Sequence, residues 1–197
     1  CISQPQDTNF FNETASFYHH QSPSEYQRGM PWYERCFAHC APSQKRGEAA
    51  VNYLFDKQAP QRIAARFPRA KIIMILRDPT ERLYSHYLHA YKQIARPFND
   101  VIQTQPDFVA QGFYYQHITH YLSHFPREQL LIAIYDDALE NPHLFMQRMY
   151  EFIGVDATFT PPSIDKKINV TASKVAPPIL LFYRLQRGVV ASSRGKR

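Results

Sequence analysis

The sequence predicts an α/β fold with three layers, in which helices cover both faces of a parallel sheet. Two continuous apolar runs, Lys71–Leu76 and Gln129–Tyr135, have the length and composition of strands that are buried on both faces. The stretches between and after them carry apolar residues at helical spacing. An order of strand, helix, helix, strand and helix is typical of parallel sheets, because parallel strands need crossover connections.

The helices are predicted from apolar stripes and from their ends. Glycine at position 112 precedes one helix, and Gly154 ends another. In the last helix we expect Leu144, Phe145, Met149 and Phe152 on the inner face. Two short helical pieces are also plausible near the N-terminus, and Lys45–Leu54 is predicted to be extended and to run into a turn. The predicted helices are 24–28, 31–39, 59–67, 79–95, 113–125 and 142–153.

The length of 197 residues corresponds to a single domain, which we divide into three parts by composition. Residues 1–45 are loop-rich, residues 46–160 form the α/β core, and residues 161–197 form a basic C-terminal segment. The net charge is +6, but residues 166–197 alone carry +8 and the remainder carries −2. A basic segment predicts an anionic partner, or alternatively a solvated tail. Since the sheet region has no basic excess, we do not predict a nucleic-acid partner.

The three cysteines do not form a disulfide framework, and we expect Cys1, Cys36 and Cys40 to be ordinary packing residues. The alternative is a metal site built on Cys36, His39 and Cys40, which lacks a fourth ligand at a recognised spacing. We therefore predict no metal. Unpaired cysteines favour a cytoplasmic protein. No apolar run is long enough for a transmembrane segment.

The stretch ILRDPTERLYSHY, residues 75–87, contains the strongest candidate for a binding site. Arg77 follows the first apolar strand, and ligands of parallel α/β sheets bind beyond the carboxyl ends of the strands. Asp78 is a predicted N-cap, Pro79 fits the first helical position, and Glu81 would complete a capping box. Ser85 lies seven residues after the cap, close to two helical turns, and so faces the strand–helix junction.

A guanidinium group and a hydroxyl group placed in this way can bind one phosphate group. The sequence therefore predicts that Arg77 and Ser85 form a phosphate site. From the spacing alone, an alternative stays open, in which Arg77 pairs with a carboxylate and Ser85 packs against a neighbouring helix.

The stretch KIIMILRDPTERLYSHYLHAYK, residues 71–92, resembles the 3′-phosphate-binding segment of sulfotransferases that use 3′-phosphoadenosine 5′-phosphosulfate. The resemblance is to heparan-sulfate-type enzymes and their bacterial relatives. It extends to Gly47-Glu48 with Asn52-Tyr53-Leu54, and to GFYYQHITHYLSHFPREQLLIAIYDDALENP at residues 112–142. In all, it covers roughly residues 5–170 and consists of several motifs in the family's order.

This resemblance implies a fold like that of P-loop nucleotide kinases and a sulfuryl transfer to a hydroxyl acceptor, for which we expect a saccharide. It also implies that Arg77 and Ser85 bind the 3′-phosphate of the donor, without a metal. If the source is eukaryotic, the implied location is the Golgi lumen. The family further has an upstream strand, phosphosulfate loop and helix, which we expect to be missing here, so that the 197-residue chain alone would be inactive.

The resemblance assigns the general base to Asp7, in Pro5-Gln6-Asp7-Thr8-Asn9-Phe10-Phe11, which resembles a Lys-Glu-x-x-Phe-Phe segment. A base at this position would remove the proton from the acceptor hydroxyl as its oxygen attacks sulfur. This chain has Asp instead of Glu, Gln6 instead of Lys, and Ala49 where heparan-type enzymes carry Lys. The alternative for Asp7 is a turn or cap residue.

Two further sets of residues are candidates near the donor. Tyr114 and Tyr115 follow Gly112, and we prefer a role in the core for them over contact with adenine or the acceptor. A basic loop closes the donor site in the family, and the candidates for it are Lys166, Lys167, Asn169 and Lys174. The alternative function is a non-catalytic protein of this fold that binds a glycan or another polyanion.

Overall fold

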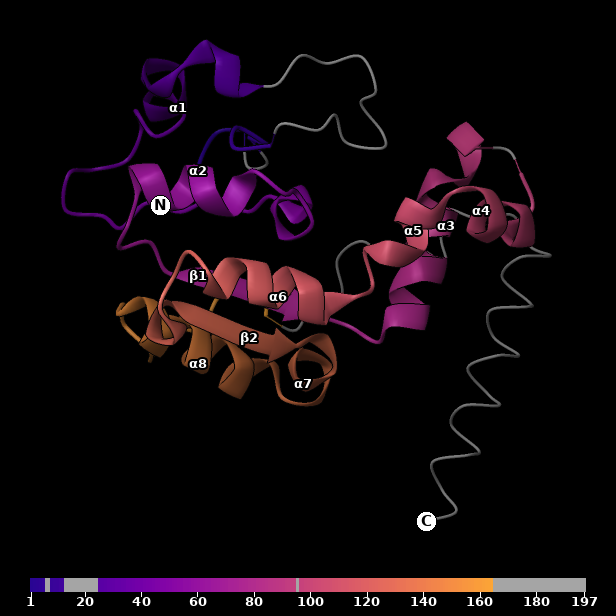
Figure 1. Cartoon of the computed structure of the whole chain (residues 1–197). Helices are drawn as coiled ribbons and strands as arrows, with labels where there is room; N and C mark the ends of the chain where they lie inside the picture. Colours follow the sequence, from indigo (N-terminus) through magenta and orange to yellow (C-terminus); the bar gives the residue numbers. More distant parts are fainter. Residues whose placement is uncertain (6–7, 13–24, 95, 165–197) are drawn as a thin grey trace.

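The structure is a computed structural model, and it describes residues 1–5, 8–12, 25–94 and 96–164. Strand β1 (Ile72–Leu76) pairs with strand β2 (Leu130–Ile134) in a parallel register that runs from Ile72 opposite Leu130 to Leu76 opposite Ile134. Both predicted strands are therefore confirmed, as is their parallel arrangement. Their carboxyl ends lie at the same edge of the sheet (Figure 1).

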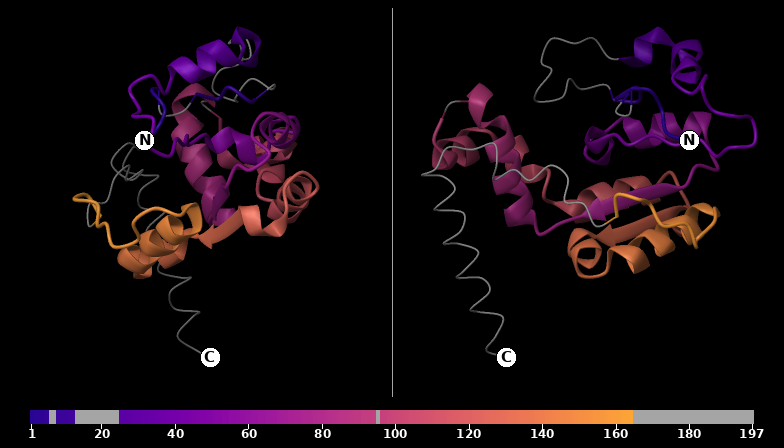
Figure 2. Two further views of the ribbon diagram at one scale, coloured as in Figure 1. Left: turned by 90° about the vertical axis from the view of Figure 1, so that its left-hand side faces the viewer. Right: turned by 180° about the vertical axis from the view of Figure 1, so that it is seen from behind.

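Helices cover the sheet on two sides, as predicted. Helices α2 (Ala59–Arg66) and α6 (Tyr114–Leu122) lie on one side, and α7 (Tyr135–Glu140) and α8 (Pro142–Ile153) lie on the other (Figures 1 and 2). Met74 and Leu76 of β1 are buried. Ile75 is 52% exposed, so the prediction that β1 is buried on both faces is wrong for this residue. In the described residues the sheet has two strands, and its cover is incomplete beside Ile75.

Helix α3 (Pro79–Ile94) leads from the end of β1 away from the sheet and packs against α4 (Phe98–Thr104) and α5 (Pro106–Ala110) (Figure 1). The predicted stripe supplies Tyr87 and Leu88, which are buried with Val101 and Phe108 in a separate small core. We did not predict α4 and α5. They are short, and each buries one large apolar residue against α3.

The N-terminal part consists of η1 (Glu25–Arg28), α1 (Met30–Arg35) and η2 (Val51–Leu54) with connecting loops. Its core is aromatic. Phe10 is completely buried, Phe11 is 1% exposed, and both rings contact Tyr33. This core continues to the sheet through Met74 and Leu130. The predicted extended piece is confirmed in part: Gly47 forms a parallel bridge with Ile2, and the turn that follows is η2.

Helix α8 begins and ends as the sequence predicts. The Asn141 side chain accepts a hydrogen bond from the backbone N–H of Leu144, and Gly154 ends the helix with a left-handed backbone. Phe145 and Met149 are buried, but Leu144 is 51% exposed. Leu144 was wrongly predicted to be internal, because it lies about 100° around the helix from Phe145. The turn η3 (Arg127–Gln129) precedes β2.

The cysteine prediction requires a correction, because Cys1 and Cys40 form a disulfide. Cys36 is free and buried, as expected of a packing cysteine. Among the described residues, the ligand atoms of Cys1, His39 and Cys40 come together, whereas the alternative weighed from the sequence contained Cys36 in place of Cys1. Since two of these sulfur atoms are joined, the argument for a cytoplasmic location from unpaired cysteines no longer holds. Among the described helices, none has the length and hydrophobicity of a membrane span.

Candidate functional site at the end of strand β1

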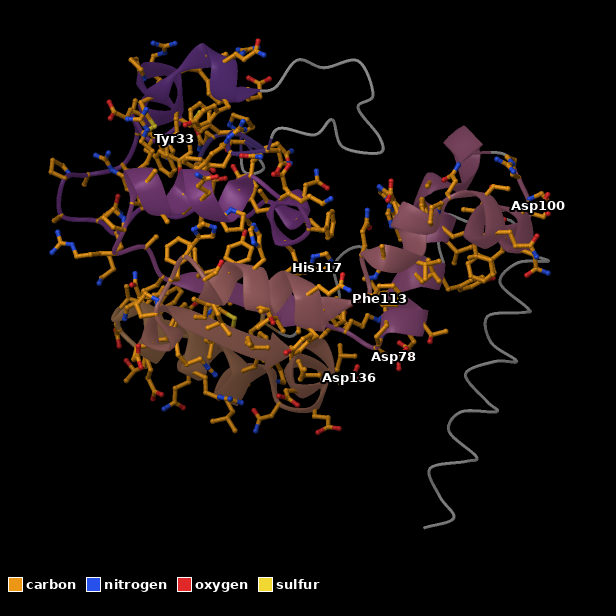
Figure 3. The ribbon with its side chains drawn as sticks, in the orientation of Figure 1. Tyr33, Asp78, Asp100, Phe113, His117 and Asp136 are labelled. Atoms are coloured by element: carbon orange, nitrogen blue, oxygen red, sulfur yellow. A yellow bond between two sulfur atoms is a disulfide. The ribbon has the colours of Figure 1, made fainter. Side chains whose placement is uncertain are left out.

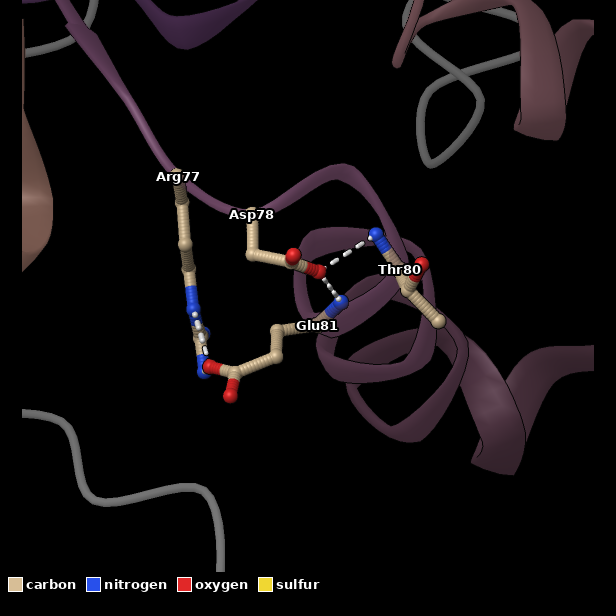
Figure 4. A network of polar contacts seen from close by, with 4 residues as sticks. All are labelled: Arg77, Asp78, Thr80 and Glu81. Carbon is tan, nitrogen blue, oxygen red and sulfur yellow. Dashed lines mark hydrogen bonds and ion pairs between the residues drawn. The ribbon is translucent and has the colours of Figure 1, made fainter. Parts of the chain in front are cut away.

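Arg77 lies directly after β1, where the chain turns into α3 (Figure 4). Asp78 caps the helix: its Oδ1 accepts hydrogen bonds of 2.9 Å from the backbone N–H groups of both Thr80 and Glu81. Pro79 occupies the first helical position, where a missing N–H costs nothing. The N-cap prediction is therefore confirmed. This cap fixes the direction in which α3 leaves the sheet, and with it the position of the side chains in the first turn.

The Arg77 guanidinium forms an ion pair with the Glu81 carboxylate (Figure 4). Nε and one terminal nitrogen of Arg77 donate to the same Glu81 oxygen, at 3.2 and 2.7 Å. Glu81 was predicted to complete a capping box, but its carboxylate binds the Arg77 side chain instead. A charged donor four residues away provides a stronger hydrogen bond than a backbone N–H.

Aromatic contact and partial burial further define the position of Arg77. Its guanidinium carbon lies 5.6 Å from the centre of the Tyr135 ring, at the start of α7. The side chain of Arg77 is 22% exposed and that of Glu81 is 37% exposed. The end of β1 and the beginnings of α3 and α7 therefore meet at one half-exposed ion pair, which we call the strand-end junction.

Ser85 lies one helical turn beyond Glu81 on the same face of α3, and it is half-buried. Since Glu81 contacts Arg77, the order along this face is Arg77, Glu81 and Ser85. The sequence left open that Arg77 pairs with a carboxylate, and the structure contains such a pair. The pairing of Arg77 and Ser85 on one phosphate stays a prediction.

The start of α6 lies beside the strand-end junction. A Cβ atom at Gly112 would lie 3.3 Å from the Pro79 side chain, so a larger residue there would need the two segments to move apart by a few tenths of an ångström. Arg82 extends in the same direction and donates to the backbone oxygen of Phe108 at 2.8 Å. Figure 3 shows Asp78, Phe113 and Asp136 around this edge of the sheet.

The two tyrosines after Gly112 differ from each other. Tyr114 is partly buried and packs against the main core, as predicted. Tyr115 is 82% exposed, so the core interpretation is wrong for this residue. On a helix, neighbouring residues point about 100° apart, and only one of the two can face the core. Tyr115 and Phe113, which is 54% exposed, present aromatic surface at the start of α6.

Asp7, the predicted base, lies outside the described residues, as do Gln6, Lys166, Lys167, Asn169 and Lys174. The residue after Asp7 is well defined by its contacts. The Thr8 hydroxyl is within hydrogen-bond distance of both Glu48 carboxylate oxygens, at 3.0 and 3.1 Å, and of the Tyr53 hydroxyl at 3.3 Å. The Tyr53 hydroxyl also accepts a hydrogen bond from the Phe11 backbone. These contacts attach the N-terminal segment to η2.

The Glu48 carboxylate influences the tyrosines around it. Burial, followed by the charge of Glu48 and a hydrogen bond to it, raises the pKa of Tyr33 and of Tyr53 far above the usual range. Both hydroxyls therefore stay protonated. Gly47-Glu48 was singled out in the sequence only because it resembles a family motif. No periodicity in the sequence predicts that hydroxyl groups bind the Glu48 carboxylate.

Comparison with known proteins establishes the family. Residues 4–175 match the sulfotransferase domain family. The chain belongs to this family. The match includes β1, the strand-end junction, α6 and β2, which confirms the resemblance drawn from the motifs.

Several heparan sulfate sulfotransferases are similar to this sulfotransferase-family chain. It is 34% identical over 174 residues to the bifunctional heparan sulfate N-deacetylase/N-sulfotransferase 4 of Mus musculus, which covers 78% of this chain and 19% of the relative. It is 28% identical over 162 residues to the heparan sulfate glucosamine 3-O-sulfotransferase 6 of Homo sapiens, covering 77% of this chain and 46% of the relative. The chain thus spans less than half the length of these relatives.

A solved sulfotransferase from Alicyclobacillus acidocaldarius has the same fold. The TM-score is 0.69 at 22% sequence identity, and the superposition covers 88% of this chain and 78% of the bacterial one. This similarity supports the α/β arrangement with its parallel sheet.

Proposed function

We propose that this chain forms the body of a sulfotransferase catalytic domain. The protein would transfer a sulfuryl group from 3′-phosphoadenosine 5′-phosphosulfate to a hydroxyl group, and the acceptor would be a saccharide. The proposal is carried by one observation: in a chain of the sulfotransferase family, Arg77 lies at the carboxyl end of β1, with Ser85 two turns along the helix that begins there. The names of the relatives, which include heparan sulfate sulfotransferases, support a saccharide acceptor.

In the proposed complex, Arg77 and Ser85 hold the 3′-phosphate of the donor. The guanidinium supplies charge and directed N–H groups, and the hydroxyl supplies one more donor. Their role is to position the donor, since neither group takes part in bond making. The ring of Tyr135 and the capped start of α3 limit where the Arg77 side chain can move.

The transfer itself is a displacement at sulfur. The acceptor oxygen forms a bond to sulfur while the bond between sulfur and the donor's bridging oxygen breaks, and 3′-phosphoadenosine 5′-phosphate leaves. Asp7 would take the proton of the acceptor hydroxyl. This assignment is supported by the resemblance of residues 5–11 to the family's Lys-Glu-x-x-Phe-Phe segment.

The second candidate function is binding of a glycan or polyanion without transfer. The binding function is favoured by Ala49, an exposed neutral residue at the position where heparan-type enzymes carry Lys. The location of the protein also stays a proposal, either the cytoplasm or, for a eukaryotic source, the Golgi lumen.

A transfer assay tests the proposal and separates the two functions. The natural full-length protein is incubated with donor carrying labelled sulfate and with desulfated heparan-type oligosaccharides. We expect label in the oligosaccharide and formation of 3′-phosphoadenosine 5′-phosphate in equal amount. Tight binding of the oligosaccharide without any transfer of label would contradict the proposed reaction and support the binding function.

A further inference from the structure

Glu81 occupies the position at which the proposed function needs the donor's 3′-phosphate. It is bound through one oxygen to two nitrogens of Arg77, the group assigned to the phosphate. We propose that Glu81 is an internal competitor for the phosphate site and that the donor displaces it. This inference rests on the proposed function, and it assigns to Glu81 a role in setting the affinity for the 3′-phosphorylated donor.

The geometry of α3 places the competitor between the two phosphate-binding groups. Glu81 and Ser85 are four residues apart in α3, so they lie on one helix face with Cβ atoms about 5–6 Å apart. Arg77 precedes the helix, and its side chain reaches the Glu81 carboxylate. A phosphate that reaches both Arg77 and Ser85 must pass over the Glu81 position. The carboxylate and the phosphate therefore cannot both bind Arg77 as Glu81 does here.

The charges determine which anion prevails. A carboxylate carries one negative charge, whereas a phosphate monoester carries about 1.5 to 2 at neutral pH and has three strong acceptor oxygens. A phosphate can therefore displace Glu81, while a ribose hydroxyl at the same position cannot. After displacement, Glu81 and the phosphate are like charges near each other, so the carboxylate has to turn toward water.

The surroundings permit this movement. The Glu81 side chain is 37% exposed, so it is solvated when it leaves Arg77. Its backbone N–H remains bound to Asp78, and the helix cap is kept. Exposed ion pairs of this spacing are weak, so the exchange costs little. The contact therefore lowers the affinity for nucleotides that carry the 3′-phosphate, because each of them has to displace Glu81 from Arg77.

Calorimetry on the natural full-length protein tests the proposal with 3′-phosphoadenosine 5′-phosphate and with adenosine 5′-phosphate as probes. For Glu81→Gln, which removes the charge and keeps the shape, we expect the affinity for the first probe to rise roughly two- to fivefold. The affinity for the second probe should stay unchanged. Glu128→Gln is the matched control, since it removes an equal charge from η3, which precedes β2 at the opposite edge of the sheet.

An unchanged or weaker affinity of Glu81→Gln for the 3′-phosphorylated probe would overturn the inference, because Glu81 would then only orient Arg77. Should the variant fail to fold, the Arg77 Nε–H signal of the wild-type protein is followed by NMR. The signal should move on addition of 3′-phosphoadenosine 5′-phosphate and not of adenosine 5′-phosphate, and no movement with either would contradict displacement. If the wild-type protein does not distinguish the two nucleotides, the proposed phosphate site itself fails, which is a separate outcome.

Discussion

Two glutamates in this protein have opposite environments: Glu48 lies in a stable hydrogen-bonded cluster, and Glu81 lies at the proposed binding site. Glu48 is surrounded by hydroxyl groups, those of Thr8, Tyr33 and Tyr53, next to an aromatic core. Glu81 is bound to one guanidinium at a half-exposed junction. A carboxylate held by several buried hydroxyls is costly to move, because each of them would lose a partner. A half-exposed ion pair exchanges readily with another anion.

The difference indicates which parts of the fold are fixed and which are exchangeable. The region around Glu48 ties the N-terminal segment to η2 and α1, and it contains Phe10 and Phe11, which are at most 1% exposed. The strand-end junction contributes little burial and brings together charged groups from β1 and α3. We therefore expect substitutions in the first region to affect stability and those in the second to affect ligand affinity.

The largest effect is expected for Phe11→Ala. Phe11 is 1% exposed and its ring contacts Tyr33 and Tyr53, so the substitution leaves a cavity. We expect a loss of about 3–5 kcal/mol in the free energy of unfolding, measured by denaturant titration. The folded variant should bind 3′-phosphoadenosine 5′-phosphate with wild-type affinity. Phe159→Ala is the control, since Phe159 is 56% exposed. A large change in affinity would mean that the two regions are not independent.

A smaller effect is expected for Asp7→Asn, which tests whether the N-terminal region also has a catalytic role. If Asp7 is the base, turnover should fall by roughly 10² or more, because the variant cannot accept the acceptor's proton. Nucleotide affinity should stay the same. Asp100→Asn, at the first turn of α4, serves as the control. Turnover at the wild-type rate would assign the base to another residue and leave Thr8 and Glu48 with a structural role only.

A pH-dependent effect on stability is expected for His86, which follows Ser85 but faces α5. The His86 ring stacks on the Phe108 ring, with 4.1 Å between the ring centroids. Burial, followed by the charges of Arg82 and His89, lowers the pKa of His86 to about 4. The unfolded chain takes up a proton near the ordinary value of 6.5, before the folded protein does. Stability should therefore fall as the pH drops from about 6.5 to about 4, by at most about 1.4 kcal/mol per pH unit.

Denaturant titrations of wild-type protein and of His86→Gln across this pH range measure the effect. The variant should have a shallower dependence on pH, because it lacks the group that titrates. Equal slopes would show that His86 does not couple protonation to folding, and that the two faces of α3 differ less than their contacts indicate.

Local sequence signals predicted the elements that position the site. The apolar runs determine β1 and β2, and Asp78 with Pro79 determines the start of α3, because these signals depend on neighbouring residues alone. Helix α7 was missed, since it begins at Tyr135 directly after β2 without a turn residue. The disulfide of Cys1 with Cys40 was missed because its formation depends on the path of 39 residues.

The candidate site was predicted in outline but not in its internal contacts. The positions of Arg77 and Ser85 relative to the sheet follow from spacing. The partner of Glu81 does not, because an acidic residue at this position can bind the Asp78 backbone or the Arg77 side chain. The spacing of four residues between Arg77 and Glu81 was the available signal. The contact of Arg77 with Tyr135 joins two segments that are far apart in the sequence, so it could be found only once the fold was known.

The central claim is that Arg77 binds the 3′-phosphate of an adenosine nucleotide. Calorimetric titration of the natural full-length protein and of Arg77→Ala with 3′-phosphoadenosine 5′-phosphate tests it most directly. We predict micromolar binding by the wild-type protein and a loss of about 2 kcal/mol or more in the variant, as for a charge-assisted hydrogen bond. The affinity for adenosine 5′-phosphate should not change. Equal affinity of the wild-type protein and the variant for the 3′-phosphorylated nucleotide would contradict the claim.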